Sequence, residues 1–317
     1  MSDRPLPELD GVEHQFIDVD GLRMHVALAG RGEPLVLLHG WPQHWWQWRH
    51  LIGLLAEHHR VICPDLRGLG WTAAPPDGYG PAAMADDVIG LLDRLGVRAF
   101  DLIGHDWGGA AGYVLALRFP DRVRHFIAIN TASPFLRPTP RVLLNGRRLW
   151  HIVANAASPR LAGSVIPRWA LRHWPHHPAA LTPDDRKIFL AQFREPARVR
   201  ATVRYYRNLL LREIPLLLAG RYRWARLTVP TLVLSGDRDP LLPAGQMSGF
   251  GRHATDLRVE LLEDVGHFPA AESPTELAQR ALKFLAVNPS HTHPPPTTDA
   301  APPITNPSYN RWTQPTG

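Results

Sequence analysis

Asp106 lies in a stretch whose glycine spacing suits a sharp turn that exposes one reactive side chain. Residues 102–109 read Leu-Ile-Gly-His-Asp-Trp-Gly-Gly, so an apolar run that predicts a strand enters a tight turn and then a predicted helix. The pattern G-x-D-x-G has the layout of a nucleophile elbow, with aspartate where serine is usual. Gly104, Gly108 and Gly109 suit the backbone crowding of such a turn. We therefore predict that Asp106 is a nucleophile presented over the end of a sheet.

An aspartate nucleophile does different chemistry from a serine. A serine hydroxyl must lose its proton before it attacks and is suited to acyl carbons. A carboxylate is already anionic at neutral pH and can displace a leaving group from a saturated carbon, which forms an alkyl ester. The expected electrophile is therefore an epoxide or an alkyl halide.

Three further motifs follow predicted strands along the chain. The sequence H-G-W-P at residues 39–42 ends the strand before the first crossover helix. D-R-D at 237–239 follows the predicted strand 231–234, and V-G-H-F-P at 265–269 follows the predicted strand 258–262. The order nucleophile, acid, histidine is that of a catalytic triad on a fold of alternating strands and helices.

Taken together, these motifs resemble the α/β-hydrolase superfamily, and within it the epoxide hydrolase and haloalkane dehalogenase branch that uses an aspartate nucleophile. The resemblance covers residues 14–286 and depends on the set H-G-x-P, D-x-R-G-x-G, G-H-D-W-G-G, G-x-x-D and G-H-F. It implies that Asp106 is the nucleophile, Asp239 the acid and His267 the base.

The reaction that the resemblance implies has two steps. Asp106 opens the epoxide to give an alkyl-enzyme ester, and His267, oriented by Asp239, then activates the water that hydrolyses the ester to a vicinal diol. The backbone N–H groups of Trp41 and Trp107 are implied to form the oxyanion hole. The histidines lack a clustered ligand pattern such as H-E-x-x-H, so we expect no metal and no other cofactor.

Two neighbouring carboxylates compete for the role of the acid. In Gly-Asp-Arg-Asp the family pattern favours the last residue, Asp239, over Asp237. Some dehalogenases instead carry their acid after the strand that corresponds to residues 125–129. Here the residue at that place is Asn130, an uncharged amide, which again favours Asp239.

The cap region is expected to provide a proton donor for the epoxide oxygen. Epoxide hydrolases generally use two cap tyrosines, and Tyr-Tyr-Arg-Asn at residues 205–208 resembles the segment that provides one of them. Tyr206 matches the residue just before the arginine. Tyr205 is the better candidate for a tyrosine that only packs between cap and core.

The second cap tyrosine is missing from the expected region, residues 149–157. Trp150, His151 and Asn155 stand there instead, and His151 or Asn155 is the candidate replacement donor. With His39, these three are the candidate substrate-binding residues. His39 and His105 are otherwise interpreted as structural groups beside the site.

The alternative reading within the same branch is a haloalkane dehalogenase. The Trp107 indole could bind a leaving halide, but dehalogenases usually carry asparagine where this chain has Trp41. A fluoroacetate-type enzyme would carry arginine after the nucleophile. A non-catalytic ligand-binding protein of the same fold is the alternative of another class, and the intact nucleophile, acid and base argue against it.

The elements that must position these residues alternate between strand and helix and predict an α/β fold, and the resemblance implies that it is the α/β-hydrolase fold. Its mostly parallel sheet is flanked by helices and interrupted by a helical cap. The predicted parts are residues 1–133 as the first part of the core, 134–224 as the cap, 225–288 as the second part, and 289–317 as a Pro-rich disordered tail.

Composition excludes several other functions. The 317 residues include 35 Lys and Arg and 29 Asp and Glu, a net charge of +6. Nearly all the basic residues are arginine, without an interleaved stacking motif, so we expect no nucleic-acid partner. Cys63, the only cysteine, excludes an internal disulfide and lies in an apolar run that predicts an inert buried thiol.

The expected partners are a small hydrophobic epoxide and water. No signal peptide is visible, and no apolar run approaches the roughly 20 residues that span a bilayer. We therefore expect a cytoplasmic protein with no membrane partner, either a monomer or a homodimer.

Overall fold

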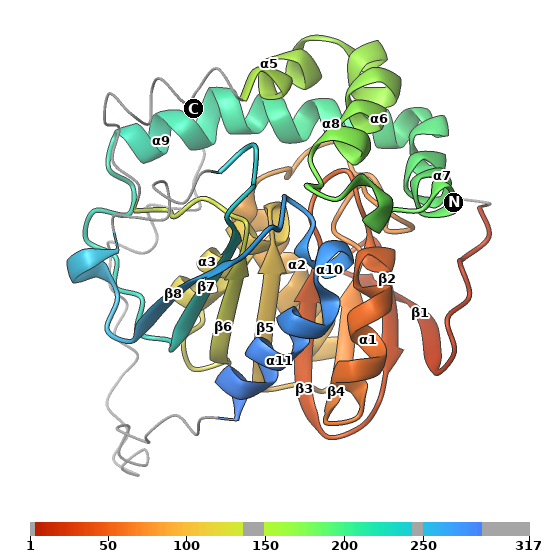
Figure 1. Cartoon of the computed structure of the whole chain (residues 1–317). Helices are drawn as coiled ribbons and strands as arrows, with labels where there is room; N and C mark the ends of the chain where they lie inside the picture. Colours follow the sequence, from red (N-terminus) through yellow and green to blue (C-terminus); the bar gives the residue numbers. More distant parts are fainter. Residues whose placement is uncertain (1–3, 136–148, 243–249, 287–317) are drawn as a thin grey trace. The chain divides into compact units, whose positions relative to one another are not determined.

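The computed structural model describes residues 4–135, 149–242 and 250–286, and its frame is an eight-stranded sheet in the order β1-β2-β4-β3-β5-β6-β7-β8 (Figure 1). The pairs β1–β2 and β2–β4 are antiparallel, and all other neighbours are parallel. This confirms the predicted mostly parallel sheet. The strands are Val12–Val19 (β1), Leu22–Ala29 (β2), Glu33–Leu38 (β3), His59–Pro64 (β4), Phe100–His105 (β5), Val123–Ile129 (β6), Thr231–Gly236 (β7) and Leu257–Leu262 (β8).

The central strands are buried because helices cover both faces of the sheet. Every residue of β5 and β7 is buried, which explains why these strands read as continuous apolar runs. Helices α1 (Arg49–Ala56) and α11 (Pro274–Leu285) pack against each other on one face (Figure 1). Helices α2 (Pro81–Arg94) and α3 (Trp107–Arg118) pack together on the other. The apolar residues form two core clusters, one on each side of the sheet.

An inserted helical region lies between β6 and β7, across the carboxyl ends of the parallel strands (Figure 1). We call this region the cap. Part of the predicted cap, residues 136–148, lies outside the described residues, as does the predicted tail. The cap helices are Trp150–Ala157 (α5), Ile166–His173 (α6), Pro183–Ala191 (α7), Pro196–Asn208 (α8) and Ile214–Leu218 (α9), with π-helical turns at Leu161–Val165 and Leu209–Glu213.

A buried ion pair fastens the cap to the core beside α7. The Arg49 guanidinium donates to the Asp185 carboxylate at 2.7 Å, and the Trp46 indole N–H donates to the same carboxylate at 3.0 Å. Both charged side chains are at most 7% exposed. Removing one partner would leave a buried charge without compensation, which typically costs about 3–5 kcal/mol.

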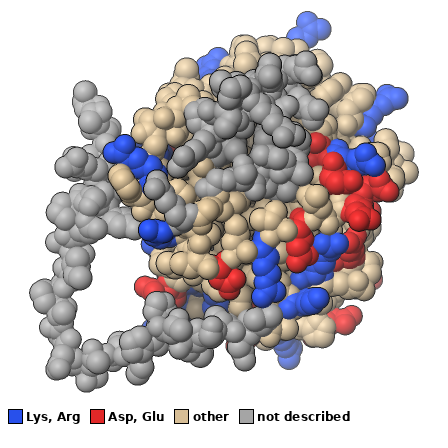
Figure 2. Space-filling model, turned by 60° about the vertical axis from the view of Figure 1, so that its left-hand side comes forward, with Lys and Arg blue, Asp and Glu red and all other residues tan. Residues whose placement is uncertain are grey.

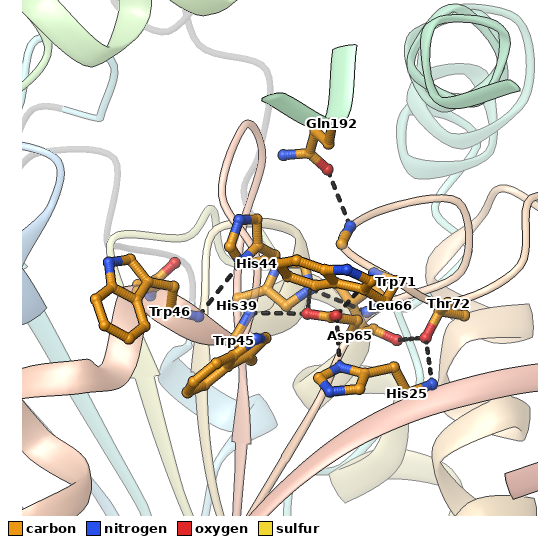
Figure 3. Close-up of polar contacts among 12 residues, drawn as sticks. His25, His39, His44, Trp45, Trp46, Asp65, Leu66, Trp71, Thr72 and Gln192 are labelled. Carbon is orange, nitrogen blue, oxygen red and sulfur yellow. Dashed lines mark hydrogen bonds and ion pairs between the residues drawn. The ribbon is translucent and has the colours of Figure 1, made fainter. Parts of the chain in front are cut away.

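A second buried carboxylate, Asp65, organises the core loops beneath the cap (Figure 3). It accepts the backbone N–H groups of Trp45 at 2.8 Å and Trp71 at 2.9 Å, and His25 donates to it at 2.7 Å. Burial opposes the charge, but His25, together with His44 and His39, outweighs burial and holds the pKa of Asp65 well below its ordinary value. Asp65 therefore joins the loop that it begins to strand β2 and to the loop after β3.

Charges of both signs are interspersed on the face of the molecule shown in Figure 2. Arg122 pairs with Asp93 at 2.7 Å, and Arg280 pairs with Glu276 at 2.6 Å. Such exposed pairs contribute at most about 1 kcal/mol each. Within the described ranges, no helix combines the length and apolar character that crossing a bilayer requires.

Candidate active site

Asp106 occupies a strained turn between β5 and α3. Its backbone has φ 49° and ψ −115°, a left-handed conformation that a residue with a side chain rarely adopts and that typically costs about 1–3 kcal/mol. The turn is tight because neighbouring backbones approach closely. A Cβ on Gly108 would lie 2.2 Å from the Leu38 carbonyl oxygen, and one on Gly104 would lie 2.5 Å from the Gly108 oxygen. Glycine at both positions therefore permits the geometry that presents Asp106.

The Asp106 carboxylate is held by two backbone N–H groups. Its Oδ2 accepts the Trp41 N–H at 2.9 Å, and the Trp107 N–H also bonds to the carboxylate. Burial raises the pKa of Asp106 to about 6, against the lowering effects of His267 and of these two N–H groups. The two predicted oxyanion donors thus already point at the carboxylate.

His267 pairs with Asp239 rather than with Asp237. Its Nδ1–H donates to Asp239 Oδ2 at 2.9 Å, with both side chains almost fully buried. Burial would lower the pKa of His267, but Asp239, followed by Asp106, outweighs burial and raises it above its ordinary value. Asp237 is more exposed and pairs with Arg238 at 3.5 Å. Of the two candidate carboxylates, Asp239 is the one in contact with the imidazole.

Asn130 completes the shell around Asp239. Its Nδ2 donates to Asp239 Oδ2 at 2.8 Å, and its Oδ1 accepts the Gly236 N–H at 3.0 Å. The other oxygen, Asp239 Oδ1, accepts the N–H groups of Leu241 at 2.7 Å and Leu242 at 3.2 Å. Asn130, which follows β6, therefore supports the carboxylate of Asp239, which follows the neighbouring strand β7.

The remaining nitrogen of His267 is open toward the site. Its Nε2 is buried and has no hydrogen-bond partner among the described residues. Electrostatic interactions of the imidazole with both Asp239 and Asp106 show that it lies near both carboxylates. A water molecule bonded to Nε2 would therefore be close to Asp106.

The two cap tyrosines differ in what their hydroxyls contact. Tyr205 donates to the Arg67 carbonyl oxygen at 2.8 Å and packs edge-on against Trp107, which is a packing position. Tyr206 turns its ring edge-on to Trp41 at 5.3 Å. Burial and the nearby Asp106 raise the pKa of Tyr206 well above its ordinary value, against the side chains of Trp107 and Asn155, which lower it. Tyr206 is therefore a protonated hydroxyl near Asp106.

The four candidate substrate-binding residues lie in different places. His151 is buried, with its ring 6.0 Å from that of Tyr206 and 5.0 Å from that of Trp174, and Asn155 is fully buried beside Tyr206. Trp150 is 46% exposed and packs on Trp169 instead. His151 and Asn155 are thus beside the site, and Trp150 lies at the cap surface.

His39 and His105 form hydrogen bonds with backbone groups. His39 donates from Nδ1 to the Gly40 oxygen at 3.0 Å and accepts the Leu66 N–H at Nε2 at 2.9 Å, so it offers no polar atom to a substrate. His105 donates from Nε2 to the His267 carbonyl oxygen at 2.7 Å. Their positions fit the structural interpretation, and for His39 they oppose a role in substrate binding.

Sequence reasoning missed Trp174, a cap residue that is 2% exposed. Its ring lies edge-on to His267 at 5.2 Å, and its carbonyl oxygen accepts the His267 N–H at 3.0 Å. No motif marks it, because the contact joins the cap to a loop far away in the sequence. Among the described residues, no group of three or more His, Cys, Asp or Glu could hold a metal ion.

Comparison with known proteins agrees with the fold. Residues 33–274 match the alpha/beta hydrolase fold family, and the chain belongs to this family. It is 31% identical over 291 residues to a soluble epoxide hydrolase of Corynebacterium sp. (strain C12), covering 87% of this chain and 98% of that relative. The chain is an epoxide hydrolase-like α/β hydrolase.

Solved structures show the same likeness. The epoxide hydrolase CorEH superposes with a TM-score of 0.76 at 29% identity, covering 87% of this chain and 99% of that one. Cfl2 from Burkholderia cenocepacia superposes with a TM-score of 0.78 at 28% identity, covering 89% of this chain and 98% of that one.

Proposed function

We propose that this protein is an epoxide hydrolase that forms an alkyl ester on Asp106 and hydrolyses it to a vicinal diol. The observation that carries the proposal is the environment of one carboxylate. Asp106 accepts two backbone N–H groups, and both His267 and Tyr206, which carries its proton, lie near enough to interact with it electrostatically. These contacts support the assignment of a nucleophile, a leaving-group acid and a base to one site.

In the first step a carboxylate oxygen of Asp106 attacks an epoxide carbon. The carbon–oxygen bond of the ring breaks, and its electron pair stays on the ring oxygen, which takes a proton from Tyr206. Tyr206 suits this role because it carries its proton at neutral pH. Burial also supports the attack, since a poorly solvated carboxylate is a stronger nucleophile.

In the second step His267 Nε2 takes a proton from water, and the hydroxide attacks the carbonyl carbon of the ester. The Trp41 and Trp107 N–H groups stabilise the tetrahedral oxyanion, because its oxygen occupies the place where Asp106 Oδ2 now lies. Collapse of this intermediate breaks the bond to the ester oxygen, which leaves as the diol with the proton of the newly added hydroxyl group and restores the Asp106 carboxylate. The proton held by His267 then returns to the Tyr206 phenolate, so that both groups are ready for the next turnover. One carboxylate oxygen then comes from water, so a single turnover in heavy-oxygen water should label Asp106.

We assign the role of the missing second cap tyrosine to His151. Asn155 lies close enough to the Tyr206 hydroxyl to lower its pKa, so its amide is beside that donor and on the same side of the site. The ring of His151 lies edge-on to the rings of both Tyr206 and Trp174, from a different cap helix. A donor there would reach the leaving oxygen from a second direction.

The Trp107 side chain favours an epoxide over a halide. Its ring lies edge-on to that of Tyr206 at 5.9 Å and lowers the pKa of the Tyr206 hydroxyl, so the side chain that would bind a leaving halide is placed against the proton donor instead. Haloalkane dehalogenase therefore remains the second candidate. The two are separated by incubating the protein with styrene oxide and with 1-bromobutane and measuring diol and bromide. Diol without bromide is expected, bromide without diol would support the dehalogenase, and neither product would support a binding protein.

A further inference from the structure

Trp41 contacts the nucleophile with its backbone and the cap with its side chain. Its N–H donates to Asp106 Oδ2 at 2.9 Å, and its indole N–H donates to Thr202 Oγ1 at 3.2 Å. Trp41 and Thr202 are both fully buried, so water cannot substitute for either partner. One residue of the core thus connects the reactive carboxylate with cap helix α8.

Thr202 lies one helical turn before Tyr206 on α8. Residues four apart project from the same face of a helix, so Thr202 and Tyr206 both face the core. The rings of Trp41 and Tyr206 meet edge-on at 5.3 Å with an interplanar angle of 89°. The hydrogen bond between Thr202 and Trp41 therefore also fixes the position of Tyr206 relative to Trp41, whose N–H binds Asp106.

Gln192 makes a second bond between the cap and the same loop. Its Nε2 donates to the carbonyl oxygen of Pro42 at 2.8 Å, and its Oε1 accepts the Gly70 N–H at 2.9 Å (Figure 3). Gln192 is fully buried. The loop of the predicted oxyanion donor is thus bonded to the cap on both sides of the Trp41–Pro42 peptide.

We propose that Thr202 is a positioning residue for the ring-opening step. Its hydrogen bond to Trp41 holds helix α8 in the position at which Tyr206 lies close to the Asp106 carboxylate. This inference rests on the proposed function, because it concerns the step in which Tyr206 protonates the epoxide oxygen. A displaced α8 would separate Tyr206 from the ring oxygen.

The test uses two substitutions that differ by one oxygen. Thr202→Val keeps the shape and removes the acceptor, whereas Thr202→Ser keeps the acceptor. In a His267→Gln background, the rate of adduct formation on Asp106 with styrene oxide reports ring opening alone. We expect Thr202→Val to slow adduct formation about tenfold, because the proton donor is no longer aligned. We expect Thr202→Ser to form the adduct at nearly the parent rate. An unchanged rate in Thr202→Val would overturn the proposal.

Two further combinations distinguish positioning from general support of the fold. In a Tyr206→Phe background, Thr202→Val should have no additional effect on ring opening, because the donor that it aligns is gone. An equal tenfold loss there would show a merely structural role. Trp41→Phe removes the same bond from the other side and keeps the backbone N–H. The double variant with Thr202→Val should be no slower than either single variant, and additive losses would contradict the shared bond.

A readout independent of activity keeps the inference separate from the proposed function. The indole N–H proton of Trp41, identified in NMR spectra by its loss in Trp41→Phe, should exchange slowly in the parent and in Thr202→Ser. It should exchange faster in Thr202→Val. Equal exchange in all three would overturn the Trp41–Thr202 bond, whereas a parent that makes no diol would overturn the proposed function alone.

Discussion

At the residue scale, two carboxylates in one site are kept in unlike environments. Asp239 accepts hydrogen bonds from His267, Asn130, Leu241 and Leu242, which occupy both of its oxygens. Asp106 has only two backbone N–H donors and lies in a less polar setting, where burial raises its pKa to about 6. A fully satisfied carboxylate is a poor nucleophile. In the reaction that we propose, these environments would separate the carboxylate that reacts from the one that orients the base.

Replacing the base should separate the two half-reactions. In His267→Gln we expect ring opening to proceed and ester hydrolysis to stop, because only the second step needs a proton acceptor beside the ester. Mass spectrometry after mixing with styrene oxide should show a stable adduct, and peptide mapping should place it on Asp106. The control Asp106→Ala in the same background should stay unmodified. An unmodified His267→Gln protein that still folds would contradict the scheme.

The neighbouring cap tyrosines offer a matched comparison. Tyr206→Phe should lower the rate on epoxides by about 10²–10⁴-fold, the usual contribution of a positioned acid. Tyr205→Phe should leave ring opening nearly unchanged and cost about 1 kcal/mol of stability, because its hydroxyl bonds to the Arg67 carbonyl oxygen. Rates on styrene oxide and urea unfolding curves measure the two effects. Similar rate losses in both variants would remove the role assigned to Tyr206.

At the element scale, the site depends on how closely β5, α3 and the loop after β3 approach one another. A Cβ on Gly108 would meet the Leu38 carbonyl oxygen at 2.2 Å, so Gly108→Ala must move the helix start or the loop that carries Trp41. We expect it to abolish diol formation and to destabilise the fold by more than about 2 kcal/mol.

Gly53, in helix α1, is the matched control, because a Cβ there would meet nothing within 4 Å. Gly53→Ala should stabilise the protein by about 0.5–1 kcal/mol, since alanine is the better helix former. Urea unfolding and diol assays on both variants check the pair. An active Gly108→Ala enzyme would show that the turn tolerates a side chain at this position. It would contradict the inference that close backbone packing at Gly108 is needed to position Asp106.

The same scale explains what the sequence could predict. Continuous apolar runs such as Leu35–Leu38 predict buried strands directly, and the strand-end motifs follow because parallel strands end at one edge. Contacts between cap and core are different. Thr202 and Trp174 meet the site only through the way the cap folds back, which no local pattern encodes. Trp150 shows the converse: its place in the expected segment suggested a substrate contact, yet its helix turns it outward.

At the scale of the whole molecule, buried imidazoles link stability to pH. Burial lowers the pKa of His39, of His105 and of His44, the last to about 3. Between about pH 6.5 and these lowered values, the unfolded chain binds protons that the folded chain does not, so stability falls as pH falls. Asp106 and His267 act oppositely, because their folded pKa values are raised. The histidines whose pKa is lowered outnumber these two residues, since they also include His14, His50 and His59.

We therefore expect the free energy of unfolding to decrease from about pH 7 to pH 4.5, with a slope that corresponds to a net uptake of about two protons, each giving about 1.4 kcal/mol per pH unit. Urea unfolding at several pH values measures this slope. His44→Asn is the control, because asparagine keeps an acceptor for the Trp46 N–H, which His44 now bonds, but cannot titrate. Its slope should be smaller by about one proton, because the unfolded variant has one imidazole fewer to protonate. If the free energy of unfolding of the parent did not change with pH, the unfolded chain would gain no more protons than the folded one. The buried histidines would then not be the cause of lower stability in acid.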